Sequence, residues 1–186
     1  MKLLTLLVLS SLALFSTSCG DDEALFTSGQ VSVKLNLKEG DVVSERLEDR
    51  KNISTESSNP YGAFLNEVDR TFGDSPREIR VEEVSIEISE TKDDVATFAD
   101  LWPQEFEVFF AADDSVSGYT IATASSATNV GPITMTLDEN VNRQEVQDLL
   151  NSGNFRVGVR GNTEQTSSAK FDTTLNITTA FGVYER

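Results

Sequence analysis

The chain has 186 residues, of which 15 are Lys or Arg and 31 are Asp or Glu, so its formal net charge is −16. This length fits one domain, alone or with a leader and a tether. The chain contains one Cys and no His, which excludes His-dependent triads, His-ligated metal centres, internal disulfides and zinc sites built from several Cys ligands. So large an acidic excess also repels phosphates, and we therefore expect no nucleic-acid partner.

Residues 1–18 predict a secretory signal peptide. Lys2 supplies the positive charge, an apolar stretch of 13 residues runs from Leu3 to Phe15, and small residues follow at 16–18. A helix that spans a bilayer needs about 20 apolar residues, so the stretch fits a cleaved leader better than a membrane anchor.

The residues at the end of this leader resemble a bacterial lipoprotein signal. Cys19 is the only Cys of the chain, and Ser18 precedes it at the expected cleavage point. The lipoprotein pattern usually has Leu where this chain has Ser16, so ordinary cleavage before Cys19 is the alternative. The resemblance implies that Cys19 is lipidated and that its acyl chains hold the protein to a lipid bilayer.

An acidic segment follows the Cys and resembles the surface-export signal of Bacteroidota lipoproteins. It reads Gly-Asp-Asp-Glu at positions 20–23. The resemblance implies a location at the bacterial outer membrane, on its surface or its periplasmic face. We expect residues 19–28 to act as an acidic tether and residues 29–186 to form the folded domain.

Seven segments of the domain alternate between apolar and polar residues, as half-buried strands do. Where Glu82 and Glu83 interrupt the second segment, the shifted alternation predicts a β-bulge. Such strands suit two antiparallel sheets packed face to face, so we expect an all-β, immunoglobulin-like sandwich, with a partly open barrel as the alternative. The seven segments are 31–38, 79–88, 106–110, 119–123, 133–137, 155–159 and 171–183.

Three segments predict short helices. Apolar residues four apart at 64–72 precede Gly73, and a helical turn at 98–102 precedes Pro103. Asn142 and Glu145 have the spacing of a capping box, so we expect the third helix to begin at Asn142. Residues 41–60 and 90–94 lack periodicity and are expected to be exposed connections.

Two weak candidate sites can be proposed from short motifs. Asp138, Asn140 and Asn142 place oxygen ligands at alternate positions, a spacing that Ca²⁺ loops use. The simpler interpretation is a turn followed by a helix N-cap, with no cofactor. Ser115 lies in an Asp-Ser-Val triplet that resembles the O-glycosylation acceptor of Bacteroidota.

The leading functional hypothesis is a non-catalytic lipoprotein whose sandwich binds an unknown protein or glycan. Loops at 41–76 and 90–103 are the expected contact surfaces. One alternative is a structural subunit of a surface fibre or envelope complex, using residues 171–183 if they lie at a sheet edge. Another is a carboxylate-based glycan hydrolase, which needs a cleft with two close carboxylates, one with a raised pKa.

Overall fold

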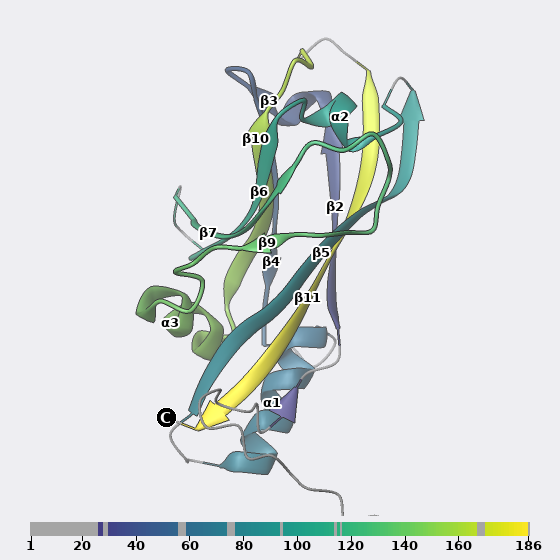
Figure 1. Cartoon of the computed structure of the whole chain (residues 1–186). Helices are drawn as coiled ribbons and strands as arrows, with labels where there is room; N and C mark the ends of the chain where they lie inside the picture. Colours follow the sequence, from purple (N-terminus) through teal and green to yellow (C-terminus); the bar gives the residue numbers. More distant parts are fainter. Residues whose placement is uncertain are drawn as a thin grey trace, which may run out of the picture.

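The computed structural model describes residues 26–27, 30–55, 59–73, 77–93, 95–113, 115, 117–166 and 170–185. They form a sandwich of two antiparallel sheets, one of five strands and one of six (Figure 1). The all-β sandwich predicted from the alternating strands is therefore confirmed. Apolar side chains from both inner faces fill the space between the sheets.

The five-stranded sheet is built around two long strands, β5 (Arg77–Asp93) and β11 (Phe171–Glu185), which pair along their whole length. The far side of β11 pairs first with β1 (Phe26–Thr27) and then with β2 (Val31–Lys38). On the other side, β8 (Ile133–Thr134) pairs with β5. Because β11 lies inside the sheet, the edge pairing considered for residues 171–183 has no free edge to use.

Two bulges interrupt the pairing of β5 with β11. Ala180 and Phe181 pair with Glu83 and Val81, so Glu82 is the extra residue and the predicted bulge is confirmed. A second shift lies at Ser89, which the sequence did not indicate. The expected connection at 90–94 was wrong up to position 93, because the backbone there continues to pair with β11 while its side chains at 90–92 remain exposed.

The six-stranded sheet has the order β3-β4-β10-β6-β7-β9. Four of its strands are long, and the two outer ones, β3 and β9, have two residues each. Along the chain the strands are β3 (Val42–Val43), β4 (Arg46–Ile53), β6 (Glu105–Ala111), β7 (Tyr119–Ser125), β9 (Thr136–Leu137) and β10 (Phe155–Asn162).

The expectation of an unstructured connection at 41–60 was wrong, because β3 and β4 form a hairpin within it. The turn residues Ser44 and Glu45 have φ of 51° and 62°, as a two-residue type I′ turn requires, although Asn-Gly is the usual signal for such a turn. In β4 only Leu47 and Ile53 are buried, and polar residues occupy the inward positions between them. The alternation of apolar and polar residues that predicts a half-buried strand is therefore missing from the sequence of β4.

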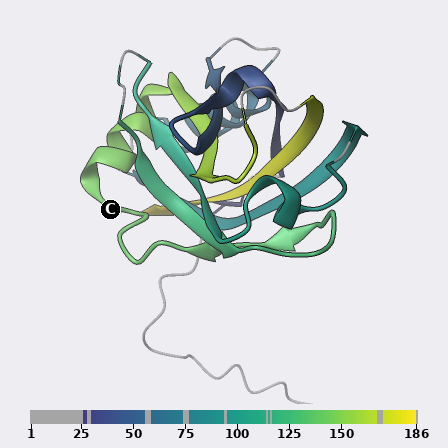
Figure 2. The same cartoon turned by 90° about the horizontal axis from the view of Figure 1, so that it is seen from above.

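The segment 133–137, expected to form one strand, passes from one sheet to the other. Its first half is β8 beside β5, and its second half is β9 beside β7. At the crossing, Met135 donates its backbone N–H to the carbonyl of Val84 at 2.8 Å. This crossing closes one side of the sandwich, which looks barrel-like when seen along its axis (Figure 2).

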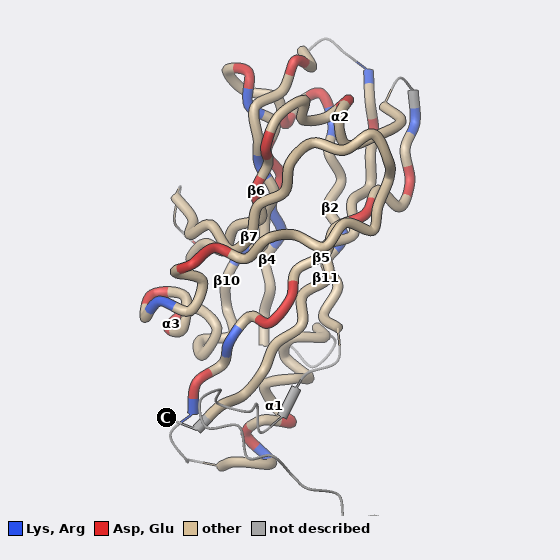
Figure 3. The backbone as a smooth tube through the Cα atoms, viewed as in Figure 1, with Lys and Arg blue, Asp and Glu red and all other residues tan. Residues whose placement is uncertain are grey.

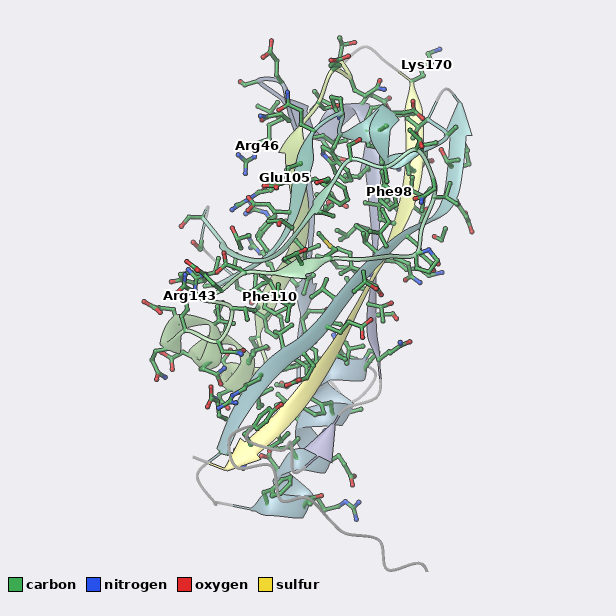
Figure 4. The ribbon with its side chains drawn as sticks, in the orientation of Figure 1. Arg46, Phe98, Glu105, Phe110, Arg143 and Lys170 are labelled. Carbon is green, nitrogen blue, oxygen red and sulfur yellow. The ribbon has the colours of Figure 1, made fainter. Side chains whose placement is uncertain are left out.

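Helices close the ends and one flank of the sandwich. The first, α1 (Pro60–Phe72), ends at Gly73 as predicted and covers the end where β10 begins. At the other end lies α2 (Phe98–Leu101), followed by the fully buried Trp102, whose ring stacks on Phe106 at 4.8 Å. Phe98 and Phe110, labelled in Figure 4, are both fully buried: Phe98 stacks on Phe106, and Phe110 contacts Phe155.

The third helix, α3 (Gln144–Ser152), begins two residues later than expected. Arg143 is its N-cap residue, so the expected cap at Asn142 was wrong. The Asn142 side chain instead accepts a hydrogen bond from the backbone of Val81 in β5. A long-range partner thus replaces the local one that the capping-box spacing suggested.

Candidate functional site

Unpaired edge strands expose backbone N–H and C=O groups that can pair with another chain, so the long sheet edges are the first candidates for a binding surface. The edge of β5 is covered over most of its length. Ile79 donates to the Gln147 side chain at 3.2 Å, Val81 donates to the Asn142 side chain at 3.3 Å, and β8 pairs with the middle of the strand. Further along, the Ile88 N–H donates to the Val130 carbonyl at 2.7 Å.

The edge of β7 is covered in a similar way. β9 pairs with Ala122 and Thr123. Beyond it, the N–H of Asp138 donates to the carbonyl of Ile121 at 2.8 Å. Loops and helix side chains thus occupy the edges on the side where segment 133–137 joins the two sheets.

On the opposite side of the sandwich, the described residues supply no such cover. There β2 and β4 run antiparallel as edge strands of different sheets, joined through η1 (Glu39–Asp41) and β3. We call residues 32–36 of β2 and 49–53 of β4, with Ser54 just after the strand, the β2–β4 seam.

One carboxylate bridges the seam at its narrow point. Asp49 in β4 accepts the N–H of Asn36 in β2 at 3.0 Å and the N–H of Arg50 at 2.7 Å. Lys38 lies two residues after Asn36 in β2, and its N–H donates to the Asp41 carboxylate of η1 at 2.7 Å. Carboxylate side chains therefore take the place of a neighbouring strand along this half of β2.

The other half of β2 lacks these acceptors. Alternate residues of an antiparallel strand direct their N–H and C=O groups to the same side, so Ser32 and Lys34 face the seam as Asn36 and Lys38 do. By the same rule Asn52 faces the seam from β4, two residues beyond Arg50. Within the described part of the chain, the N–H groups of Ser32, Lys34 and Asn52 have no hydrogen-bond partner.

A groove of about 430 Å³ lies at this open half of the seam. Lys34 and Lys51 both line it, and none of the described residues of its lining is Asp or Glu. Neither Lys forms an ion pair with another described residue, although most Arg side chains in the described ranges do. The described residues of the lining are Ser32, Val33, Lys34, Lys51, Asn52, Ile53, Ser54, Asn59 and Pro60. The groove is therefore locally positive in a strongly acidic protein.

A second groove of about 600 Å³ lies beside the preceding residues of β4, and its lining includes Asp41, Glu48 and Asp49. Partial burial raises the pKa of Asp49, and repulsion from Asp41 adds to the rise, while the two N–H bonds and the nearby charge of Lys51 oppose it. Two carboxylates, one with a raised pKa, thus lie at one groove, as a hydrolase would require. Both nevertheless accept backbone N–H groups of β2.

The predicted Ca²⁺ ligands do not converge on a shared site. One Asp138 oxygen accepts the N–H of Asn140 at 2.8 Å and the guanidinium of Arg143 at 2.8 Å. Asn142 turns away to the edge of β5. An Arg side chain thus supplies the positive charge at Asp138. In the described ranges, no three His, Cys, Asp or Glu side chains are grouped as a metal site would need.

The candidate glycosylation residue Ser115 is half-buried, and its hydroxyl donates to the carbonyl of Ser117 at 2.7 Å. Its own carbonyl accepts a bond from Arg50 at 3.3 Å, which holds the loop against the outer face of the six-stranded sheet. The signal peptide (1–18), Cys19 and residues 20–25 lie outside the described residues, as do the neighbours of Ser115 at 114 and 116. None of the helices described here is long and apolar enough to cross a membrane.

The sequence could have indicated only part of the seam. Strand 31–38 was predicted, but β4 was not, so the groove between the two strands could not be anticipated. The single available signal was the inward-facing Asp49 and Lys51 between Leu47 and Ile53. Inward-pointing charges are a common device at edge strands.

Comparisons with known proteins give no family. No protein-family model and no curated protein matches the sequence. Among solved structures, a chain of Cocksfoot mottle virus is 11% identical, with a TM-score of 0.33, over 100% of this chain and 94% of that one. A chain of Desmodium yellow mottle tymovirus is 10% identical, with a TM-score of 0.25, over 99% and 96%. At these TM-scores neither likeness informs the function of this protein.

Proposed function

We propose that this chain is a non-catalytic lipoprotein of the bacterial envelope, anchored through Cys19, whose β-sandwich binds a protein or glycan partner at the β2–β4 seam. One observation carries the choice of surface. The other long sheet edges of the described region are covered, whereas the seam keeps backbone donors without partners. Edges left open at a groove are suited to binding.

This proposal moves the contact surface away from the loops first expected to form it. Segments 41–76 and 90–103 contain β3, β4, α1 and α2 rather than long loops. What they contribute is one wall of the seam, through β4, and the start of α1 at Asn59 and Pro60.

The glycan hydrolase remains a second candidate because Asp41 and Asp49 lie at one groove. A hydrolase would need both carboxylates free to exchange protons with a substrate. In this protein both act as acceptors for the edge of β2, so we favour a structural role for them. Hydrolysis of a surface glycan by the protein, abolished by both Asp41→Asn and Asp49→Asn, would reverse this preference.

Site-specific photo-crosslinking on living cells tests the proposed surface. A photoreactive amino acid at Asn52, in the seam, is compared with one at the exposed Glu83 on the covered strand β5. The proposal predicts an adduct at Asn52 that is absent at Glu83, and sensitivity to protease or to glycosidases identifies the partner's class. Equal labelling at both positions, or none at Asn52, would overturn it.

Intact mass tests the anchor separately. Native protein extracted from membranes with detergent should have the mass of residues 19–186 plus two or three acyl chains. The Cys19→Ser variant should lose both the added mass and the membrane association. A bare polypeptide mass for the native protein would refute the lipoprotein part of the proposal.

A further inference from the structure

We infer that the β2–β4 seam takes an extended acidic peptide segment of a partner protein, added as a strand beside β2. The inference rests on the proposed function and narrows its unknown partner to one chemistry. Three features of the seam support it: the spacing of its free backbone donors, the alternation of its side chains and its charge.

The backbone donors match a peptide strand. Ser32 and Lys34 are two residues apart on a regular strand, and their N–H groups face the groove. Two residues of an extended chain span about 7 Å, which is also the repeat at which an antiparallel neighbour presents its carbonyls. A glycan has no donor and acceptor series with this repeat, so the regular edge favours a main chain.

The side chains around the groove set the sequence of the added strand. Val33 and Ile53 are buried on the inward side, whereas Lys34 is exposed on the outward side. Residues of an added strand alternate in the same way. Its inward positions would therefore contact Val33 and Ile53 and should be apolar. Its outward positions would lie beside Lys34 and should be acidic.

Charge also argues against a second copy of this chain as the occupant. If two β2 strands paired antiparallel through this edge, Lys34 of each copy would lie close to Lys34 of the other, and like charges across a strand pair are destabilising. An acidic strand instead gains directly from Lys34 on the outward side, and the charge of Lys51 adds to the positive potential of the groove; neither Lys is in an ion pair with another described residue. Figure 3 shows that acidic positions are spread over many elements of the two sheets, so the pair of Lys residues at the groove contrasts with the overall charge of the protein.

A fluorescent, end-blocked Val-Glu-Val-Glu-Val-Glu-Val peptide is the probe, and the same peptide with Lys in place of Glu is its control. Anisotropy titrations against the full chain should detect binding of the Glu peptide only. The double variant Lys34→Glu/Lys51→Glu should weaken that binding roughly tenfold or more and should favour the Lys peptide. Lys170→Glu changes an exposed Lys at the start of β11, outside the groove (Figure 4), and should leave the binding unchanged.

Hydrogen exchange distinguishes strand addition from simple charge attraction. Binding of the Glu peptide should protect the amides of Ser32 and Lys34, with no added protection along β5. No binding of the Glu peptide, unchanged binding by the double variant, or binding without this protection would overturn the inference. A glycan adduct at Asn52 together with failure of the peptide would refute the inference alone, whereas the absence of any adduct at Asn52 would refute the proposed function as well.

Discussion

Phe109 is held on the outer face of the six-stranded sheet between two glycines, and this packing allows a test in which a stability change reverses sign. The ring is only 1% exposed. A Cβ added to Gly158 would lie 2.4 Å from the ring's Cζ, and one added to Gly118 would lie 2.4 Å from its Cδ2. Gly158 pairs with Phe109 across β10 and β6, so the contact depends on the register of these strands.

Two opposing effects decide the outcome of Gly158→Ala. Removing a Gly from the interior of a strand usually stabilises by about 0.5–1 kcal/mol. Overpacking a filled site costs about 1–3 kcal/mol, and the added Cβ would also lie 2.9 Å from the Cβ of Arg50. We therefore expect Gly158→Ala to lower the free energy of unfolding by about 1–2 kcal/mol, which corresponds to a fall in Tm of roughly 2–8 °C for a domain of this size.

Urea unfolding of four chains measures this effect: wild type, Gly158→Ala, Phe109→Leu and the double variant. Leu lacks the Cε1 and Cζ atoms that the new methyl group would meet, so in the Phe109→Leu background the same substitution should become neutral or stabilising. Gly40→Ala, whose Cβ would have nothing within 4 Å, is the matched control. A Gly158→Ala change that destabilises equally in both backgrounds would refute the proposed contact.

Three further variants test other parts of the structure. Tyr61→Phe removes a buried hydroxyl that donates to the Leu150 carbonyl at 2.9 Å. It should lower the free energy of unfolding, measured by thermal denaturation, by about 1–2 kcal/mol. A smaller loss would mean that water takes the place of the hydroxyl at that carbonyl. Because burial raises the folded-state pKa of Asp49 above 3.8, wild-type stability should fall relative to Asp49→Asn as the pH rises through that raised pKa; urea unfolding across a pH series checks this, and a rise would contradict it. Glu45→Gly relieves a positive φ of 62° and should raise the free energy of unfolding by about 0.5–1 kcal/mol. Calorimetry measures this as a higher Tm, and an unchanged Tm would contradict the prediction.

Strands with one buried face and one exposed face were predictable from sequence because their side chains keep strict alternation. In β11 the buried and half-buried residues alternate from Phe171 to Phe181. The bulge at Glu82 was visible for the same reason, since one extra residue shifts the alternation. Helix α1 was predicted from its apolar stripe and from Gly73, where the backbone has φ of 59°.

The candidate site could not be predicted, because its features depend on contacts between distant segments. β4 borders the open seam, and only Leu47, its second residue, and Ile53, its last, are buried. Asn142 has ideal spacing for a local cap, yet it binds Val81, 61 residues away. Segment 133–137 alternates like one strand, but its two halves pair with different sheets. No local pattern distinguishes these cases from the simpler interpretations.

The position of β11 has a consequence for the order in which the protein can fold. Residues 172–179 are the partners of β2, although almost the whole domain separates the two strands in sequence. Closing so long a loop costs entropy before any pairing can compensate for it. During synthesis the backbone groups of β2 that pair with β11 therefore stay without their partners until β11 has left the ribosome. Only then can the five-stranded sheet assemble, so a chain stalled or cut before residue 171 should be a substrate for chaperones and proteases rather than a partly folded domain.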